Sequence, residues 1–298
     1  MTQAMRAFAK WATARPLRLI LLSIVFVQIL APVSAALIVL DALRRGPVAA
    51  MTSALLAITG FALISLALGA GLVEALSLSA PVLLASVAIG ALLGWSRSLS
   101  LTFQCLMVGA VVVSLLLFTV VPGVDQLGDF LLNETLLLLE SVGLDQERLT
   151  LFGATSGNLL VQFLLTSVLL SLLAALMLGY WWYALLDPSA RFGVDFRALK
   201  LGRFAGSVLI VLVALRLFVA VEMIQNMAQL AVVGFLFQGL AVMHARGHSD
   251  NWHRAIIVLV YVALFSFSPL ALMVIVGLTV VGLLDNFFAL RARIEPHS

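Results

Sequence analysis

The chain contains eight long apolar stretches, seven of them without charge, and short charged links separate most of them. A helix needs about 20 apolar residues to cross the hydrocarbon core of a bilayer, and most runs reach that length. The pattern therefore predicts an all-α fold, a polytopic transmembrane helical bundle. The stretches are Leu19–Leu40, Gly46–Val73, Ala75–Ser96, Ser98–Val124, Leu149–Leu186, Phe204–Val221 with its single Arg216, Met223–Ala245 and Ala255–Leu284.

Composition and charge narrow the class of protein. The 298 residues are 63% hydrophobic and 10% charged, whereas a soluble domain carries about 25% charged residues. The net charge of +3 is small and the basic residues are scattered along the chain, so the sequence does not indicate a nucleic-acid-binding surface. The single cysteine, Cys105, excludes a disulfide framework and a thiolate metal cluster. The lipid bilayer is therefore the first expected partner.

Two stretches contain an interior proline, Pro32 in the first and Pro269 in the last. Because proline removes a helical hydrogen bond, we expect each stretch to be a hairpin of two short helices. The alternative is a proline kink in one long tilted helix. If both stretches fold back, fifteen of the 17 Lys and Arg lie on one side, and Arg148 alone lies on the other. Basic residues stay inside, so this predicts a multi-pass protein of the bacterial inner membrane with both termini in the cytoplasm.

This topology divides the chain into five segments. The two membrane segments are separated by a link that is rich in Asp and Glu and has helical spacing of its polar residues. We expect residues 1–16 to form a basic interfacial helix, 17–121 the N-terminal transmembrane helices, 122–154 an acidic extracytoplasmic excursion with an amphipathic helix, 155–288 the C-terminal transmembrane helices and 289–298 a cytoplasmic tail.

One charge inside an apolar stretch, Arg216, is a candidate for function, because an ionisable group in hydrocarbon is costly and usually faces protein or a polar cavity. Asn158, Gln162 and Gln238 lie on neighbouring stretches. We expect these three amides and Arg216 to line one cavity that binds a small molecule. The alternatives are an arginine that snorkels to the interface and amides that only join helices.

The remaining candidates lie near the cytoplasmic surface. Asp285 and Arg291 mark the expected exit of the last helix, where the alternative role is anchoring of the helix end. His244 and His248 have the spacing of a helical metal site, but a solvated loop is the favoured interpretation. The chain contains no nucleotide-binding, zinc-protease or serine-hydrolase motif. The sequence therefore predicts a protein that is not an enzyme and holds no metal or cofactor.

Four segments carry a family resemblance: ALRRG at Ala42–Gly46, LLASVAIG at Leu83–Gly90, the run Tyr180–Leu201, and GLLDNFFALRAR at Gly282–Arg293. Their order and spacing resemble those of the YybS-like family of uncharacterised bacterial membrane proteins. That family is distantly similar to the substrate-binding S components of energy-coupling-factor vitamin transporters. The resemblance implies a compact helical bundle with a small-molecule pocket, and it places Asp285 and Arg291 in a shared ending.

Together these observations predict a non-enzymatic integral membrane protein that is a small-molecule-binding or transport-associated subunit. The expected partners are a small-molecule ligand and other membrane proteins or a coupling ATPase module, with no nucleic acid. The alternative is a structural or assembly scaffold in a membrane protein complex.

Overall fold

The structure is a computed structural model that describes residues 2–120, 123–145, 149–150, 153, 157–219, 221–247, 251–266 and 268–291. Every regular element within these ranges is a helix, which confirms the predicted all-α fold. Six helices are long and apolar enough to cross a membrane, as expected of a polytopic bundle.

The described helices differ widely in length, from 6 residues in α10 to 30 residues in α9. The six candidate membrane spans are α4, α5, α6, α9, α12 and α14. In chain order the helices are α1 Thr2–Ala12, α2 Pro16–Ile29, α3 Ala31–Arg45, α4 Pro47–Ala67, α5 Leu72–Ser96, α6 Leu99–Val120, α7 Val124–Ser141, α9 Gly157–Leu186, α10 Phe192–Arg197, α11 Arg203–Phe218, α12 Glu222–Gly247, α13 Asn251–Leu264 and α14 Pro269–Phe288.

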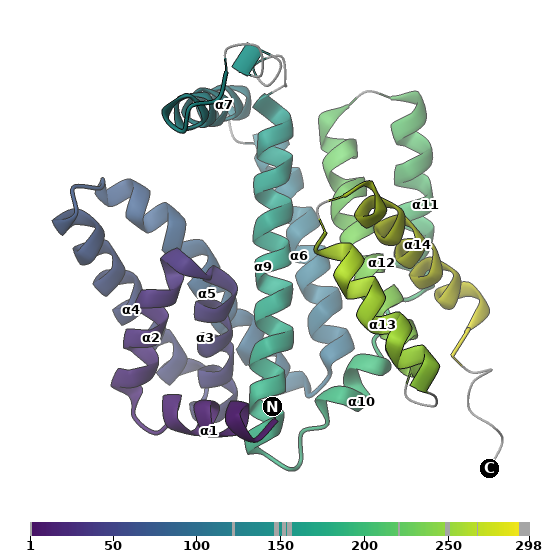
Figure 1. Cartoon of the computed structure of the whole chain (residues 1–298), viewed down its shortest axis with the longest axis horizontal. Coiled ribbons are helices and arrows are strands. Elements are labelled where there is room, and N and C mark those ends of the chain that lie inside the picture. The colour runs from purple at the N-terminus through teal and green to yellow at the C-terminus, as the bar shows by residue number, and fades with distance from the viewer. Residues whose placement is uncertain are drawn as a thin grey trace.

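Helix α9 stands at the centre of the bundle (Figure 1). On one side it packs against α1, α3 and α5, in a core that includes Leu37, Ile38 and Ala175 and extends to α2 and α4. On the other side a second core, around Phe103 and Phe235, joins α9 to α6, α10 and α12. The 30 residues of α9 span about 45 Å, which exceeds the hydrocarbon thickness of about 30 Å. Its last turns therefore reach beyond the apolar layer and carry the polar residues described below.

The first apolar stretch folds back on itself, as predicted. Helix α2 ends at Ile29 and α3 begins at Ala31, and the Ser34 hydroxyl donates a hydrogen bond of 2.8 Å to the Ser23 carbonyl across the turn. Pro32 lies in the first turn of α3, where a missing N–H breaks no helical hydrogen bond. The two helices of 14 and 15 residues span about 22 Å each, so the hairpin is too short to cross the bilayer (Figure 1).

The last stretch is also a hairpin, which confirms the second proline prediction. Helix α13 ends at Leu264, and α14 starts at Pro269 and runs back alongside α12 (Figure 1). Gly239 of α12 makes the closest approach, because a Cβ atom there would overlap the carbonyl oxygen of Leu278. Both prolines thus begin the second helix of a hairpin.

Helices lie across both ends of the bundle. Helix α1 makes an angle of 108° with α2, and Phe8 contacts Trp182 at the end of α9 with ring centroids 5.5 Å apart. At the opposite end α7 crosses the start of α9 (Figure 1), with Gly128 against Gly157 so closely that a Cβ on either would overlap the other backbone. Both flanking helices pack on α9.

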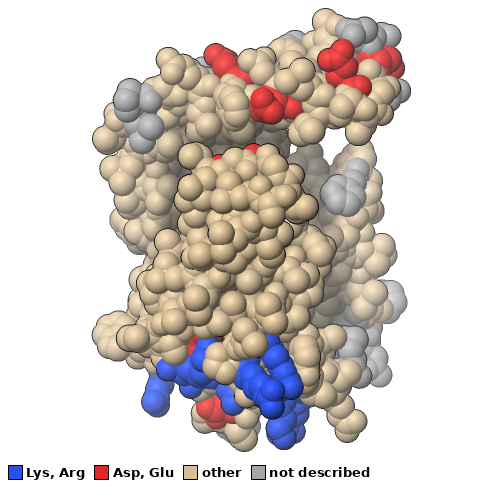
Figure 2. Space-filling model, turned by 90° about the vertical axis from the view of Figure 1, so that its left-hand side faces the viewer, with Lys and Arg blue, Asp and Glu red and all other residues tan. Residues whose placement is uncertain are grey.

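Charge is divided between the two ends of the molecule (Figure 2). Lys and Arg gather at the end where α1 lies, and acidic side chains of α7 lie at the other end. Residues 292–298 of the expected tail, several residues of the acidic segment including Arg148, and His248 fall outside the described residues.

Candidate functional site

The structure does not bring the four expected cavity residues together. Arg216 lies two residues before the end of α11 and is exposed, so its position fits the snorkelling alternative. Asn158 and Gln162 lie in the first two turns of α9, near α7. Gln238 is fully buried 16 residues into α12, about 24 Å along that helix from the α11–α12 connection. The apolar pattern placed all four residues in membrane stretches. It does not specify how deep in the membrane each residue lies or which neighbouring helix its side chain faces.

Two other amides, Asn226 and Gln229, join helices. The Ser114 hydroxyl of α6 donates a hydrogen bond of 2.6 Å to the side-chain oxygen of Asn226 on α12. Gln229 of α12 donates to the Thr166 hydroxyl of α9 at 3.0 Å. Asn226 is fully buried. These contacts tie α12 to its neighbours within the apolar layer.

Gln238 instead meets the two residues expected at the helix exit. Its side-chain nitrogen donates to the Asp285 carboxylate at 3.1 Å and to the Asn286 side-chain oxygen at 2.9 Å. Its oxygen accepts a hydrogen bond of 2.9 Å from the backbone N–H of Leu201. We call Gln238, Asp285, Asn286 and Arg291 the Asp285 cluster. Through it, α12 and α14 hold the loop that follows α10.

Arg291 completes this cluster. Its guanidinium donates to the buried Asp285 carboxylate, with the shortest N···O distance 2.5 Å. The same group donates to the main-chain carbonyl of Arg197 and, at 2.9 Å, to that of Leu199. A buried charge pair persists when hydrogen bonds satisfy its remaining donors and acceptors, which is the case here. Asp285 and Arg291 therefore fix the end of α10.

Helix α10 forms one wall of a cavity of about 660 Å³, which we call the aromatic pocket. Helices α9, α12 and α13 supply the other walls. Most of its lining is apolar, and two basic side chains belong to it, Arg197 at the end of α10 and His244 near the end of α12. Its ring-bearing residues are Phe192, Phe196, Phe237, His244, Tyr261 and Phe265.

The rings of the aromatic pocket contact one another in sequence. Phe192 and Phe196 stack with centroids 5.9 Å apart, Phe196 meets the His244 ring edge-on at 5.4 Å, and His244 meets Tyr261 at 5.9 Å. The Nδ1 atom of His244 lies 2.8 Å from the Leu240 carbonyl oxygen. A carbonyl only accepts hydrogen bonds, so Nδ1 carries a proton, and Nε2 of the neutral ring is left as a hydrogen-bond acceptor for a ligand.

The sequence of α10 explains its two faces. Phe192 and Phe196 are four residues apart and face the aromatic pocket. Arg191 and Asp195 have the same spacing and line a separate polar hollow of about 480 Å³, where the Tyr180 hydroxyl donates to Asp195. This short amphipathic helix thus separates an apolar cavity from a polar one.

The polar hollow is held together by short-range hydrogen bonds. The Tyr183 hydroxyl donates to Asp187 at 2.7 Å, and the Ser189 N–H donates to the same carboxylate at 2.9 Å. These bonds, that of Tyr183 above all, lower the pKa of Asp187 below its usual value. Asp187 therefore stays charged and fixes the turn between α9 and α10.

The arrangement suits binding of an amphiphile. Pockets of about 300 to 1,000 Å³ with apolar walls and a few polar groups are typical of small-molecule sites. Within the described part of the chain, no three His, Cys, Asp or Glu side chains are grouped as a metal ion would require. Phe192 and Phe196 are not among the site residues predicted from the sequence, although their i, i+4 spacing beside the polar Arg191 and Asp195 was a readable signal.

Comparison with known protein families, with curated proteins and with solved structures finds no match to this chain. The resemblance to the YybS-like family therefore stays a prediction.

Proposed function

We propose that the protein is a non-enzymatic integral membrane protein that binds an amphiphilic small molecule in the aromatic pocket, as a binding or transport-associated subunit. The observation that carries this proposal is the pocket itself, about 660 Å³ of mostly apolar space with Arg197 and His244 in its lining. Its volume is that of a small-molecule site.

The residues that line the aromatic pocket also favour one class of ligand. Aromatic and aliphatic side chains favour a flat or chain-like apolar body, which they would bury by dispersion and the hydrophobic effect. The Arg197 guanidinium favours a carboxylate or phosphate group at the other end. With its proton on Nδ1, His244 offers Nε2 as an acceptor for a hydroxyl group of the ligand. The proposed ligand is therefore an apolar molecule with one anionic group.

Charge distribution supports an orientation for this site. The Lys and Arg gathered at the end where α1 lies favour that end as the cytoplasmic one (Figure 2). Both termini would then lie in the cytoplasm of a bacterial inner membrane, and the aromatic pocket would lie in its inner leaflet. A transport role would need a coupling ATPase partner or an ion gradient.

The test is native mass spectrometry of the full-length protein purified in mild detergent. We expect a bound molecule in the wild type and about tenfold lower retention in Phe196→Ala, because an aromatic contact is worth about 1.5 kcal/mol. Phe204→Ala is the matched control, since Phe204 on α11 is 84% exposed and lies outside the pocket. An empty wild type, or equal retention in both variants, would contradict the proposal.

A scaffold is the second candidate function, and α7 favours it. This helix exposes Asp129, Glu134 and Glu140 together with Phe130 and Leu138 at the end opposite the basic residues. An acidic surface with exposed apolar groups is suited to a protein partner. Purified protein with an empty aromatic pocket that cross-links to one membrane protein through α7 would favour the scaffold over the binding subunit.

A further inference from the structure

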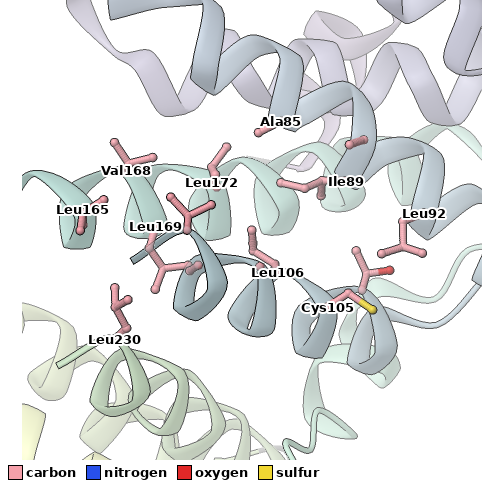
Figure 3. Close-up of a pocket in the computed structure, with 15 residues that line it drawn as sticks. Ala85, Ile89, Leu92, Cys105, Leu106, Leu165, Val168, Leu169, Leu172 and Leu230 are labelled. Atoms are coloured by element: carbon pink, nitrogen blue, oxygen red, sulfur yellow. The ribbon is translucent and has the colours of Figure 1, made fainter. Parts of the chain in front are cut away.

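A second cavity, of about 330 Å³, lies between α5, α6 and α9 within the apolar layer (Figure 3). We call it the α5–α6 cleft. Ala85 and Ile89 come from α5, Leu106 from α6 and Leu169 from α9, while Leu230 of α12 lies at the far side. The cleft belongs to different faces of α9 and α12 from those that line the aromatic pocket.

Small residues and a loosely packed helix create this space. In α6 only 17% of the membrane-spanning window is buried, against 39% in both α5 and α9. Gly109 of α6 lines the cleft, and a Cβ atom built there would meet nothing within 4 Å. Ala88 faces the same space from α5. The bundle therefore contains a gap that its own side chains do not fill.

Water is a poor occupant of this cleft. The lining is apolar except for Thr102 and Cys105. The Thr102 hydroxyl already donates to the Ser98 carbonyl at 3.0 Å, and a thiol is only a weak hydrogen-bonding group. A buried water needs two to four polar partners, whereas apolar cavities of about 150 Å³ stay dry and bind benzene. A hydrocarbon occupant is consistent with these properties.

The size of the α5–α6 cleft limits which hydrocarbon group can occupy it. A partner helix with its side chains is about 10 Å in diameter, which is too wide for this space. The spans that form the cleft are surrounded by lipid chains in a membrane, so a chain can enter from the side. We propose that the α5–α6 cleft is a binding site for one acyl chain of a bilayer phospholipid, separate from the aromatic pocket and independent of its ligand.

The first test is photo-cross-linking of the full-length protein in nanodiscs. The probe is a phosphatidylcholine with a diazirine in the middle of one acyl chain, and cross-links are mapped by peptide mass spectrometry. We expect labelling to concentrate on the α6 segment around Cys105 and Gly109, above that of the lipid-facing residue Leu63 on α4. Equal labelling of the two surfaces would overturn the proposal.

Substitutions that fill the cleft provide the second test. Gly109→Leu from α6 and Ala88→Leu from α5 each place a larger side chain into the same space. We expect either to remove the concentrated cross-links and the phospholipid that native mass spectrometry finds on the wild type. Gly277→Leu is the control, because this exposed α14 glycine also has nothing near its Cβ but lies outside the cleft.

Each result has a defined meaning. Loss of labelling in both cleft variants, with retention in Gly277→Leu, supports the site. Unchanged labelling in a cleft variant that melts at the wild-type temperature overturns it. If one variant fails to fold, the other, on a different helix, gives the answer. The mass of the retained molecule separates a phospholipid from a free fatty acid, and a fatty acid alone would overturn the assignment to phospholipid.

Discussion

Arg291 and the buried Asp285 form an ion pair that also holds the end of α10, because the same guanidinium donates to the carbonyls of Arg197 and Leu199. The last helix of the membrane bundle is thereby joined to a wall of the aromatic pocket. Asp285 and Arg291 are thus positioning residues, and any effect they have on binding acts through α10.

Removing Arg291 should destabilise the protein more than removing both members of the pair. Arg291→Met leaves the Asp285 carboxylate buried without its cation, which typically costs about 3 kcal/mol or more. The double variant Asp285→Leu with Arg291→Met removes the unpaired charge, so we expect it to recover much of that loss. Thermal unfolding in detergent measures both. A single variant as stable as the wild type would show that the pair does not hold α10.

His244 should contribute to ligand binding through its Nε2 atom. His244→Phe keeps a ring between Phe196 and Tyr261 but removes that atom. We expect about fivefold weaker retention of the co-purified ligand, since a hydrogen bond accepted by Nε2 is worth about 1 kcal/mol. The melting temperature should change little. Retention equal to that of the wild type would exclude a role for Nε2.

Two glycines of the packed helices α12 and α14 should respond in opposite ways to alanine. Gly239→Ala would place a Cβ onto the Leu278 carbonyl oxygen and force α12 and α14 apart. Gly277→Ala adds a methyl group where nothing lies within 4 Å and gains about 0.5 to 1 kcal/mol of helix propensity. We therefore expect a lower melting temperature for the first and an equal or higher one for the second. Equal melting temperatures would contradict the observed crossing.

The proposed orientation can be tested by cysteine labelling. In a Cys105→Ser background, Ser141→Cys at the end of α7 and Ser189→Cys after α9 are both at exposed positions near opposite ends of the molecule. We expect an impermeant maleimide to label the first in intact spheroplasts and the second only after the membrane is opened. The reverse pattern would place the basic end and both termini outside the cell.

The helical bundle was predictable from the sequence because its signals are local. Apolar runs specify membrane helices, and Pro32 and Pro269 indicated the two hairpins since proline acts on its own turn. The contacts among Gln238, Asp285 and Arg291 were not predictable. They depend on which faces of α12 and α14 meet, and 47 residues separate Gln238 from Asp285 along the chain. Hydrophobicity that is nearly uniform around a membrane helix does not specify such faces.

Arg216 is another residue whose depth and facing direction the sequence did not specify. Its charge within an apolar run indicated a buried functional group, yet the side chain is exposed near the end of α11. A long arginine side chain near a helix end can reach the membrane interface. The position of Arg216 in the sequence therefore suggested a deeper location in the membrane than the structure shows. Conversely, Phe192 and Phe196 lie in the six-residue helix α10, which is too short for its apolar face to stand out as a membrane stretch.

The central claim, an amphiphile bound in the aromatic pocket, is tested most directly by a high-resolution cryo-electron microscopy map of the full-length protein in nanodiscs. We predict non-protein density between α9, α10, α12 and α13, with an elongated or flat body against Phe196 and Tyr261 and its polar end near Arg197 and His244. A pocket without such density, closed by inward movement of α13, would contradict the claim.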